Sequence, residues 1–477
     1  MKKLQFSTFT LAFLALSAQA TPWMDTQDNY LRQSLQTLSH AGLISGPVNT
    51  YPLMWKNIAK DVAKAPNRRY SEEVTFALAH VRKALNVNES DKTAGIKLKA
   101  NSEVMGIQSF GESYSEKASI TVFSEFQNDI LAGRSEVHYR KLHDGSTEQE
   151  LTYDNSYLAA LLGNWVLSVD QISTWWGPGQ QSALLQSNNA RPLPSVRLSR
   201  HGWDAIDLPV LNWLGPWSFT TFIGLGEHQS AVSQTRYWGG RFNFRPTAAL
   251  ELGVSRVSQW GGQGKNNGFG DWWDMLANKD ESSANSDQRA AIDASYHFNL
   301  LNQPLTAYVE LADDDNAEDL PDNPLLLAGV RSYWGNSSGI HTVNMEYSDT
   351  YIDCPDSVVK GDCAYQGQLY PQGYSRYGRV IGSGYGKDAR VLSAGYHYQT
   401  YDGISWSGHL YLANYYDNAG ESEQSCELGC KGLGGSHTDF HTRTGDVGEL
   451  AFAHHGRRGH VANGQGVWHA QTLRMAQ

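Results

Sequence analysis

The feature that most constrains this chain is a two-residue alternation of apolar and polar side chains. From about residue 96 onward, stretches such as 96–101 and 250–255 place an apolar residue at every second position. A period of two is typical of β-strands with one apolar and one polar face. After the N-terminus, no apolar run approaches the roughly 20 residues that a membrane-spanning helix needs. The sequence therefore predicts a protein built mainly from β-strands.

Several alternating stretches come in pairs that are joined by short turns. Residues 157–162 and 165–171 flank a Gly-Asn pair, and residues 390–402 lead through an Asp-Gly pair into a returning strand. Such dipeptides favour β-hairpins with tight turns. Long polar loops are expected at residues 172–200, 259–288, 312–325 and 351–388. Short turns that alternate with long polar loops are typical of an antiparallel membrane barrel.

Composition favours a membrane barrel over a soluble α/β protein. The 477 residues include 15 Trp, 24 Tyr and 46 Gly, and the mean hydropathy is −0.47. A barrel presents only every second residue to lipid, so this low hydropathy is compatible with membrane insertion. Roughly 350 strand-and-loop residues at about 20 per strand give some 16 to 18 strands, which leaves a lumen. The formal net charge of −11 argues against nucleic acid as a partner.

The first twenty residues have the pattern of an export signal. Two lysines precede a short apolar stretch at residues 4–16, and Ala-Gln-Ala at 18–20 matches a signal-peptide cleavage site. We therefore expect a signal peptide at residues 1–20, an exported protein, and a mature chain that begins at Thr21.

Residues 25–87 differ from the rest because their apolar residues recur with a helical period. They predict three short helices that pack on one another. Such a bundle is small, so we expect it to pack against something larger. The apolar stripes are Leu31, Leu35 and Leu38; Trp55, Ile58 and Val62; and Val74, Leu78, Val81 and Leu85.

Four cysteines occur late in the chain, at Cys354, Cys363, Cys426 and Cys430. An even number in an exported chain favours disulfides, with Cys354–Cys363 the most plausible pair. A zinc site is the weaker alternative, so no metal is expected. After Gly432 the strand alternation fades and histidines accumulate. These last 40 or so residues are atypical for a barrel, and we interpret them as a loose polar terminus in place of a closing strand, with a metal-binding tail as the weaker alternative.

Two tryptophan-rich segments stand out among the polar loops. Residues 171–194 read QISTWWGPGQQSALLQSNNARPLP, and residues 256–274 read RVSQWGGQGKNNGFGDWWD. Indoles stack on sugar faces, while amides and guanidinium groups bond hydroxyls and carboxylates. Between the two segments, residues 191–256 hold seven Arg and no Lys against four acids. Arginine combined with tryptophan and amides suits an anionic polysaccharide.

Two simpler interpretations of these residues stay open. The tryptophans could belong to structural turns at a membrane interface. The arginines could line a solvated lumen and pair with acids across it. No catalytic signature is found, since Ser383 in GSGYG does not fit G-x-S-x-G, and neither H-E-x-x-H nor a P-loop occurs. We therefore expect no enzymatic activity and no cofactor, although a pair of catalytic carboxylates would leave no sequence signal.

Several strings in these segments resemble the Wzi family of capsule-assembly proteins. They are STWWGPG (173–179), NARP (189–192), LNWLGPW (211–217), GGRFNFRP (239–246), LELGVSR (250–256), QWGGQG (259–264) and WWD (272–274). The resemblance implies an all-β transmembrane barrel of about 18 antiparallel strands at residues 94–477, with a small periplasmic helical bundle at residues 21–93. It implies polysaccharide-binding residues at Trp175, Trp176, Arg191, Arg256, Trp260, Trp272 and Trp273.

The resemblance also implies a function, which is that of a non-enzymatic lectin in the cell outer membrane. Such a protein retains exported capsular polysaccharide at the cell surface and supports capsule assembly. Its expected partners are an acidic capsular polysaccharide, outer-membrane lipid and the capsule export machinery. The alternatives are a porin-like channel for small solutes and an outer-membrane hydrolase.

Overall fold

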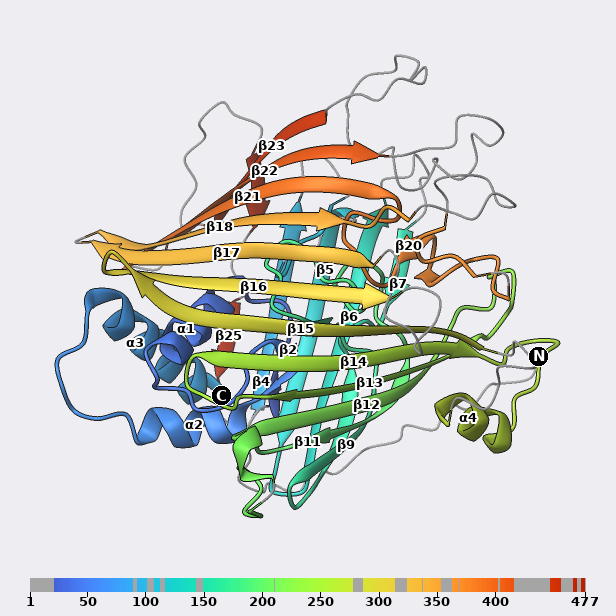
Figure 1. Cartoon of the computed structure of the whole chain (residues 1–477), viewed down its shortest axis with the longest axis horizontal. Helices are drawn as coiled ribbons and strands as arrows, with labels where there is room; N and C mark the ends of the chain where they lie inside the picture. Colours follow the sequence, from blue (N-terminus) through green and yellow to red (C-terminus); the bar gives the residue numbers. More distant parts are fainter. Residues whose placement is uncertain are drawn as a thin grey trace, which may run out of the picture.

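The computed structural model shows a closed β-barrel with a helical bundle at one end (Figure 1). We call the end that carries the helices the helix end and the opposite end the mouth. The structure describes residues 21–88, 92–100, 107–111, 116–142, 149–209, 211–277, 286–313, 324–336, 338–352, 363–367, 369–401, 404–415, 447–455, 466–469 and 473–476.

The first half of the barrel wall follows the chain order with antiparallel pairing of neighbours. Its strands are β4 (Lys92–Ala100), β5 (Glu116–Gln127), β6 (Leu131–Leu142), β7 (Gln149–Thr152), β8 (Tyr157–Leu162), β9 (Trp165–Asp170), β11 (Ser195–Arg200), β12 (Trp217–Leu225), β13 (Arg236–Phe244) and β14 (Leu250–Trp260). The predicted Gly-Asn hairpin is confirmed, since Leu162 pairs with Trp165 across the turn.

The second half continues the same meander and closes on the first strand. Its strands are β15 (Ser286–Leu300), β16 (Gln303–Asp313), β17 (Leu325–Asn336), β18 (Gly339–Asp349), β21 (Ala389–Thr400), β22 (Ser405–Tyr415), β23 (Val447–His455), β24 (Gly466–His469) and β25 (Leu473–Ala476). All these pairings are antiparallel except that of β23 with β24.

The expectation that the chain ends without a closing strand is wrong. Both β24 and β25 pair with β4, and this pairing closes the barrel. A four-residue strand is held by backbone hydrogen bonds, so it needs no long alternating pattern in the sequence. Within the described residues after Gly432, strand pairing is therefore present at 447–455, 466–469 and 473–476.

The wall has an apolar outer face and a polar inner face. Side chains such as Val254, Ile292 and Val330 point outward and are about half exposed. Their neighbours Glu251 and Asp293 point inward and are buried. This alternation is the one that the sequence predicts, and it leaves the lumen lined by charged and polar groups. Among the described helices, none is long and apolar enough to cross a membrane.

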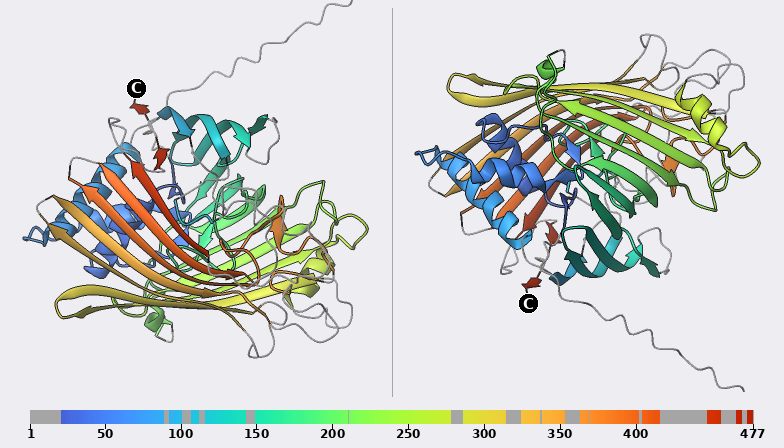
Figure 2. Two further views of the ribbon diagram at one scale, coloured as in Figure 1. Left: turned by 90° about the horizontal axis from the view of Figure 1, so that it is seen from above. Right: turned by 90° about the horizontal axis from the view of Figure 1, so that it is seen from below.

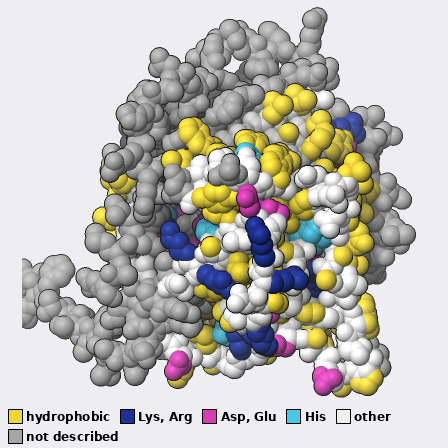
Figure 3. Space-filling view, turned by 90° about the vertical axis from the view of Figure 1, so that its left-hand side faces the viewer, with side chains coloured by type: hydrophobic (Ala, Val, Ile, Leu, Met, Phe, Trp, Pro, Cys, Tyr) yellow, Lys and Arg dark blue, Asp and Glu magenta, His cyan; other side chains and the backbone are white. Residues whose placement is uncertain are grey.

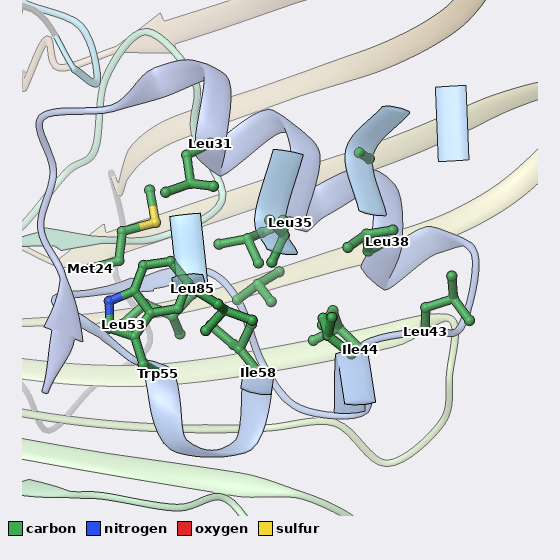
Figure 4. Packing of buried hydrophobic residues seen from close by; sticks show 14 of the residues in the cluster. Met24, Leu31, Leu35, Leu38, Leu43, Ile44, Leu53, Trp55, Ile58 and Leu85 are labelled. Atoms are coloured by element: carbon green, nitrogen blue, oxygen red, sulfur yellow. The ribbon is translucent and has the colours of Figure 1, made fainter. Parts of the chain in front are cut away.

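The helix end is closed by α1 (Asn29–His40), α2 (Trp55–Ala63) and α3 (Glu72–Asn88). Asp28 caps α1 by accepting the backbone N–H of Leu31 at 2.8 Å. The predicted stripes of all three helices are confirmed as a shared core, in which Leu35 and Ile58 are fully buried (Figure 4). Apolar packing between the helices therefore holds this end together.

The outward surface of the helix end is rich in positive charge. Figure 3 views this end and shows Lys and Arg side chains gathered across it. Exposed cations follow one another along α2 and the turn after it, at Lys56, Lys60, Lys64, Arg68 and Arg69. Lys60 pairs with the exposed Asp204 at 2.7 Å, and such surface pairs add little stability.

The lumen is filled by chain segments that are not part of the wall (Figure 2). Besides the helices, they include residues 44–54, 107–110, 171–194 and the described part of 363–388, whose side chains are mostly buried or partly buried. Three wall carboxylates hold two of these segments by their backbones. Glu251 accepts from Val48 and Asn49, while Glu346 and Glu310 accept from residues 180–184.

Of the four cysteines, one lies within the described residues. Cys363 is bonded in a disulfide. Cys354, Cys426 and Cys430 lie outside the described residues, so the predicted Cys354–Cys363 pairing stays a prediction.

Candidate functional site

The tryptophan-rich segment at residues 171–194 lies inside the barrel and forms no exposed loop. Its two tryptophans form β10 (Trp175–Trp176), which pairs with β2 (Thr50–Tyr51) from the N-terminal region. Trp175 packs against the helix core, Trp176 packs against Phe222 of the wall, and both indoles are 0% exposed. We call residues 171–194 the plug segment.

The Trp-Gly-Pro-Gly corner is what lets the plug segment approach the wall. Gly177 has a φ of 127°, and a Cβ atom there would lie 2.6 Å from a carboxylate oxygen of Glu310. At Gly179 a Cβ atom would lie 2.1 Å from the carbonyl oxygen of Ser182. Only glycine fits at either position, because the backbone approaches these acceptors so closely. The glycines therefore serve the packing of the plug segment against the wall.

Carboxylates of the wall and an arginine of α1 complete the attachment of the plug segment. Glu346 accepts the backbone N–H groups of Gln180 at 2.7 Å and Ser182 at 3.0 Å. From the helix side, Arg32 donates to the carbonyl of Gly179 at 2.8 Å. Arg32 is fully buried and also lies 4.2 Å from the ring centroid of Phe110. The plug segment is thus bonded to both the wall and the helical bundle.

Trp260, the third predicted tryptophan, is also enclosed, with 4% of its surface exposed. A polysaccharide outside the barrel cannot reach Trp175, Trp176 or Trp260 in this structure. We therefore leave these three residues out of the contact surface proposed below. Their indoles form part of the packing inside and around the barrel, and the lumen position of Trp175 and Trp176 differs from the membrane interface that the simpler interpretation expected.

Arg256 and the two remaining tryptophans lie on the outer surface of the wall. Three residues of β14 form hydrogen bonds with groups in the lumen, namely Glu251, Ser255 and Gln259. Because successive side chains of a strand point to opposite faces, Arg256, which follows Ser255, points outward. Helix α4 (Phe269–Leu276) packs there and carries Trp272 and Trp273. Arg256 donates to the last carbonyls of that helix. Arg256 therefore positions α4.

Arg191 is the predicted residue that the structure places at the mouth. Its guanidinium group bonds Asp154 at 3.0 Å and Glu150 at 2.7 Å. Burial lowers the pKa of Arg191, but these two carboxylates outweigh it and hold the pKa above its ordinary value. The same guanidinium lies 4.8 Å from the ring centroid of Tyr377, which is a stacking distance.

Tyr377 belongs to a small hairpin that the sequence reasoning did not single out. The hairpin consists of β19 (Ser375–Arg376) and β20 (Arg379–Val380), and it lies at the mouth (Figure 1). Tyr377 stands at its tip with 46% of its surface exposed. Arg376 lies 5.1 Å from the ring centroid of Tyr377 and donates to the carbonyl of Arg191 at 3.3 Å.

Burial disfavours the charged form of both arginines of this hairpin, although Arg379 donates to the backbone carbonyl and the side chain of Asn189. Burial lowers the pKa of Arg379 to about 10, and burial together with the nearby Arg191 lowers the pKa of Arg376. Among the described residues, Nε of Arg376 is buried without a hydrogen-bond partner. An anion placed here would stabilise the charged form of both groups.

We call Arg191, Arg376, Tyr377 and Arg379 the mouth patch. Beneath it, a cavity lined in part by Ile172, Arg191 and Phe222 has a volume of about 20 Å³, room for roughly one water molecule. A sugar ring does not fit into that cavity, so a glycan would lie across the surface of the patch.

The only sequence signal for the hairpin was YSRYGR (374–379), in which tyrosines and arginines alternate.

Other arginines of the 191–256 stretch serve the barrel itself. Arg197 bonds Asp170 at 3.1 Å, and Arg241 bonds Asp293 at 2.6 Å, with all four side chains buried in the lumen. These two arginines therefore line the lumen and pair with acids, as the simpler interpretation expected, but their partners lie on the next strand or the next but one along the wall and not across the barrel. Among the described residues, no group of side chains has the composition of a metal site.

Comparison with known proteins places this geometry in a family. Residues 89–410 match the family model of the capsule assembly protein Wzi. The chain belongs to the Wzi capsule assembly family. A relative from Klebsiella pneumoniae, an uncharacterized 55.8 kDa protein in the cps region, is 29% identical over 352 residues, which cover 71% of this chain and 68% of the relative.

A solved structure of a Wzi protein agrees in fold. It is Wzi of Escherichia coli, described as an outer membrane protein involved in group 1 capsule assembly and as a carbohydrate-binding β-barrel. It is 25% identical to this chain, with a TM-score of 0.73, and the match covers 82% of this chain and 85% of that one. The predicted fold class, an all-β transmembrane barrel with a small helical bundle, is confirmed.

Proposed function

We propose that this Wzi family member is an outer-membrane lectin that retains exported acidic capsular polysaccharide at the cell surface. The observation that carries the proposal is the exposed ring of Tyr377, flanked by the guanidinium groups of Arg191 and Arg376 at the mouth. A tyrosine ring offers a flat apolar face to a sugar, and guanidinium groups bind carboxylates in a fork geometry. The carbohydrate binding of Escherichia coli Wzi supports the proposal.

We propose binding without catalysis at the mouth patch. The mouth patch holds three arginines and a tyrosine. Of the carboxylates beside it, Asp154 and Glu150 are bonded to Arg191, and Glu227 accepts the backbone N–H of Tyr377 at 3.1 Å. A glycosidase needs one carboxyl group that donates a proton and a second that is free to act at the sugar. We therefore propose retention of an intact polymer, with the mouth facing outward and the helix end facing the periplasm. The capsule export machinery is the proposed source of that polymer.

The test is capsule retention in cells that carry Tyr377→Ala in place of the native protein. We expect cell-attached capsule to fall severalfold and shed capsule to rise by the same amount, while total synthesis stays constant. One stacking contact contributes about 0.5–1.5 kcal/mol of binding free energy. Because one polymer chain binds many copies of the protein, this loss is repeated at every copy. Tyr377→Phe keeps the ring and is expected to retain capsule.

Arg390→Ala is the matched control, because Arg390 also pairs with a carboxylate, Asp349, and lies 4.9 Å from the ring centroid of Tyr351. It removes an equivalent arginine outside the mouth patch and is expected to leave retention unchanged. Normal retention by Tyr377→Ala and by Arg376→Ala, in barrels shown to be folded by gel mobility, would overturn the assignment of the patch.

A further inference from the structure

Helix α4 presents an aromatic surface that the proposed glycan site does not use. Phe269 is 76% exposed and Trp273 is 54% exposed, and Trp272 lies between them with its ring centroid 5.2 Å from that of Phe269. Large exposed aromatic surfaces mark contact sites. The position of the helix on the barrel shows which kind of partner this surface meets.

The helix lies on the lipid-facing side of the wall. Arg256, which points outward, donates to the carbonyls of Met275 at 3.2 Å and Leu276 at 3.3 Å, and it also bonds Gln288 of the neighbouring strand. Ser258 Oγ lies 2.7 Å from Met275 Sδ. Polar contacts to Arg256 and Ser258 of β14 thus fix the helix against the outside of the barrel, and Gln288 of β15 holds the guanidinium of Arg256 in place.

These contacts lie where the apolar belt of the barrel ends. Val254 and Ile292 point outward and are 50% and 58% exposed, as expected for residues that face lipid. Arg256 follows Val254 by two residues on the same face, which places it about 7 Å nearer the mouth. The aromatic surface of α4 is therefore continuous with the belt and borders its outer edge.

Helix α4 is amphipathic, with an aromatic side and an acidic side, as is typical of a helix that lies in a membrane interface. At 3.6 residues per turn, Phe269, Trp272 and Trp273 fall on one side, and Asp271 and Asp274 fall on the other. Asp271 accepts the backbone N–H of Gly268 at 2.7 Å and so begins the helix. Tryptophan prefers the boundary between acyl chains and headgroups, because its ring is apolar and its N–H is polar.

The same arrangement explains why an arginine is tolerated on the outer face. An uncompensated charge on the lipid side of a barrel is destabilising. The last carbonyls of α4 carry the negative end of its dipole, and they cover the guanidinium of Arg256. We propose that α4 is an interfacial anchor whose aromatic side inserts into the outer leaflet of the membrane, with lipid as its partner.

Tryptophan quenching in lipid vesicles tests the proposal. The full barrel is reconstituted into phosphatidylcholine vesicles with bromine on the acyl chains, and soluble iodide serves as the aqueous quencher. The fluorescence difference between the native protein and the Trp272→Phe, Trp273→Phe variant isolates the two indoles. We expect this difference to be quenched by the bromolipid and to be largely unaffected by iodide.

Two further variants, both built on the Trp272→Phe, Trp273→Phe variant, keep the test decisive if the fluorescence difference between that variant and the native protein is small. Phe269→Trp returns an indole to the aromatic side and is expected to restore bromolipid quenching. Asp274→Trp places an indole on the opposite side and is expected to respond to iodide. Quenching of the Trp272 and Trp273 signal by iodide alone would overturn the proposal. Protection of that signal by soluble acidic polysaccharide would also overturn it and would assign these residues to glycan.

Discussion

The two ends of the barrel are closed by different kinds of interaction. At the helix end, Leu35 and Ile58 lie in an apolar core that three helices share. Toward the mouth, the plug segment is held by hydrogen bonds from its backbone to buried carboxylates such as Glu346. An apolar core tolerates small shifts of its members, whereas a buried carboxylate requires its donors in fixed positions. The difference teaches that the plug segment adds buried polar contacts to its apolar packing against the wall, while the helical bundle depends mainly on apolar contacts.

The largest expected effect comes from removing a polar contact of the plug segment. In Glu346→Ala, the N–H groups of residues 180–182 lose their buried acceptor. Each buried donor that stays unpaired costs about 1–3 kcal/mol, so the segment is expected to leave its position. We expect the variant to conduct ions in planar bilayers and the native barrel to stay closed. The measurement is single-channel conductance.

Asp349→Ala provides the control on the same strand, since Asp349 pairs with the partly exposed Arg390 near the mouth. It is expected to stay closed. A closed Glu346→Ala barrel with native thermal stability would mean that the carboxylate is not what holds the plug segment.

A smaller effect is expected at the helix end. Leu35→Ala removes a fully buried side chain from the core and is expected to lower the stability of the bundle by about 2–5 kcal/mol. Because the plug segment keeps its bonds to the wall, the barrel is expected to stay non-conducting. Helix melting by circular dichroism and bilayer conductance measure the two quantities. If Leu35→Ala conducts like Glu346→Ala, the two ends are coupled, and Arg32 is the residue that connects them.

The smallest effect concerns the pH dependence of the helix end. Burial, reinforced by Arg331 and Arg245, lowers the pKa of His40 from 6.5 to about 4. Below pH 6.5 the unfolded chain takes up a proton that the folded chain does not, so stability is expected to fall between pH 6.5 and 4. His40→Phe keeps the ring that stacks on His297 and is expected to melt with a weaker dependence on pH. An unchanged dependence would show that His40 does not contribute.

The sequence predicts well those features that depend on neighbouring residues. The stripe of Leu31, Leu35 and Leu38 identifies a helix because its spacing alone creates an apolar face. The Gly-Asn pair at 163–164 identifies a hairpin because the turn depends on those two residues, and Gly163 has a φ of 64°. The alternation of the strands likewise shows which side chains share a face, which was enough to predict a barrel.

The location of the plug segment could not be predicted in this way. Its acceptors Glu310 and Glu346 lie 126 and 166 residues away from the donors Leu184 and Gln180. A Trp-Gly-Pro-Gly corner indicates a turn, but its sequence does not show on which side of the wall the turn lies. The same ambiguity affects Arg256. Arginines occur on both faces of the wall, and only the alternation of side chains along β14 shows that this one points outward.

The mouth patch was predicted in part. Arg191 was identified because it follows a run of amides, whereas Arg376 and Tyr377 come from a hairpin more than 180 residues later. The alternating tyrosines and arginines at 374–379 were the available signal, but the sequence could not show that this hairpin would meet Arg191. Sites that combine distant segments need the fold before their members can be recognised.

Placing the plug segment inside a closed wall has a consequence for how this family can diversify. A loop that projects into solvent can lengthen freely, but a segment enclosed with the helices and residues 363–388 shares a fixed volume with them. A longer plug segment would require a shorter neighbour, so insertions are expected to be rare there. The tip at Tyr377 and Gly378 borders open solvent, and changes in length or side chain are tolerated there without repacking the interior. Recognition of new polymers is therefore expected to evolve first at that tip.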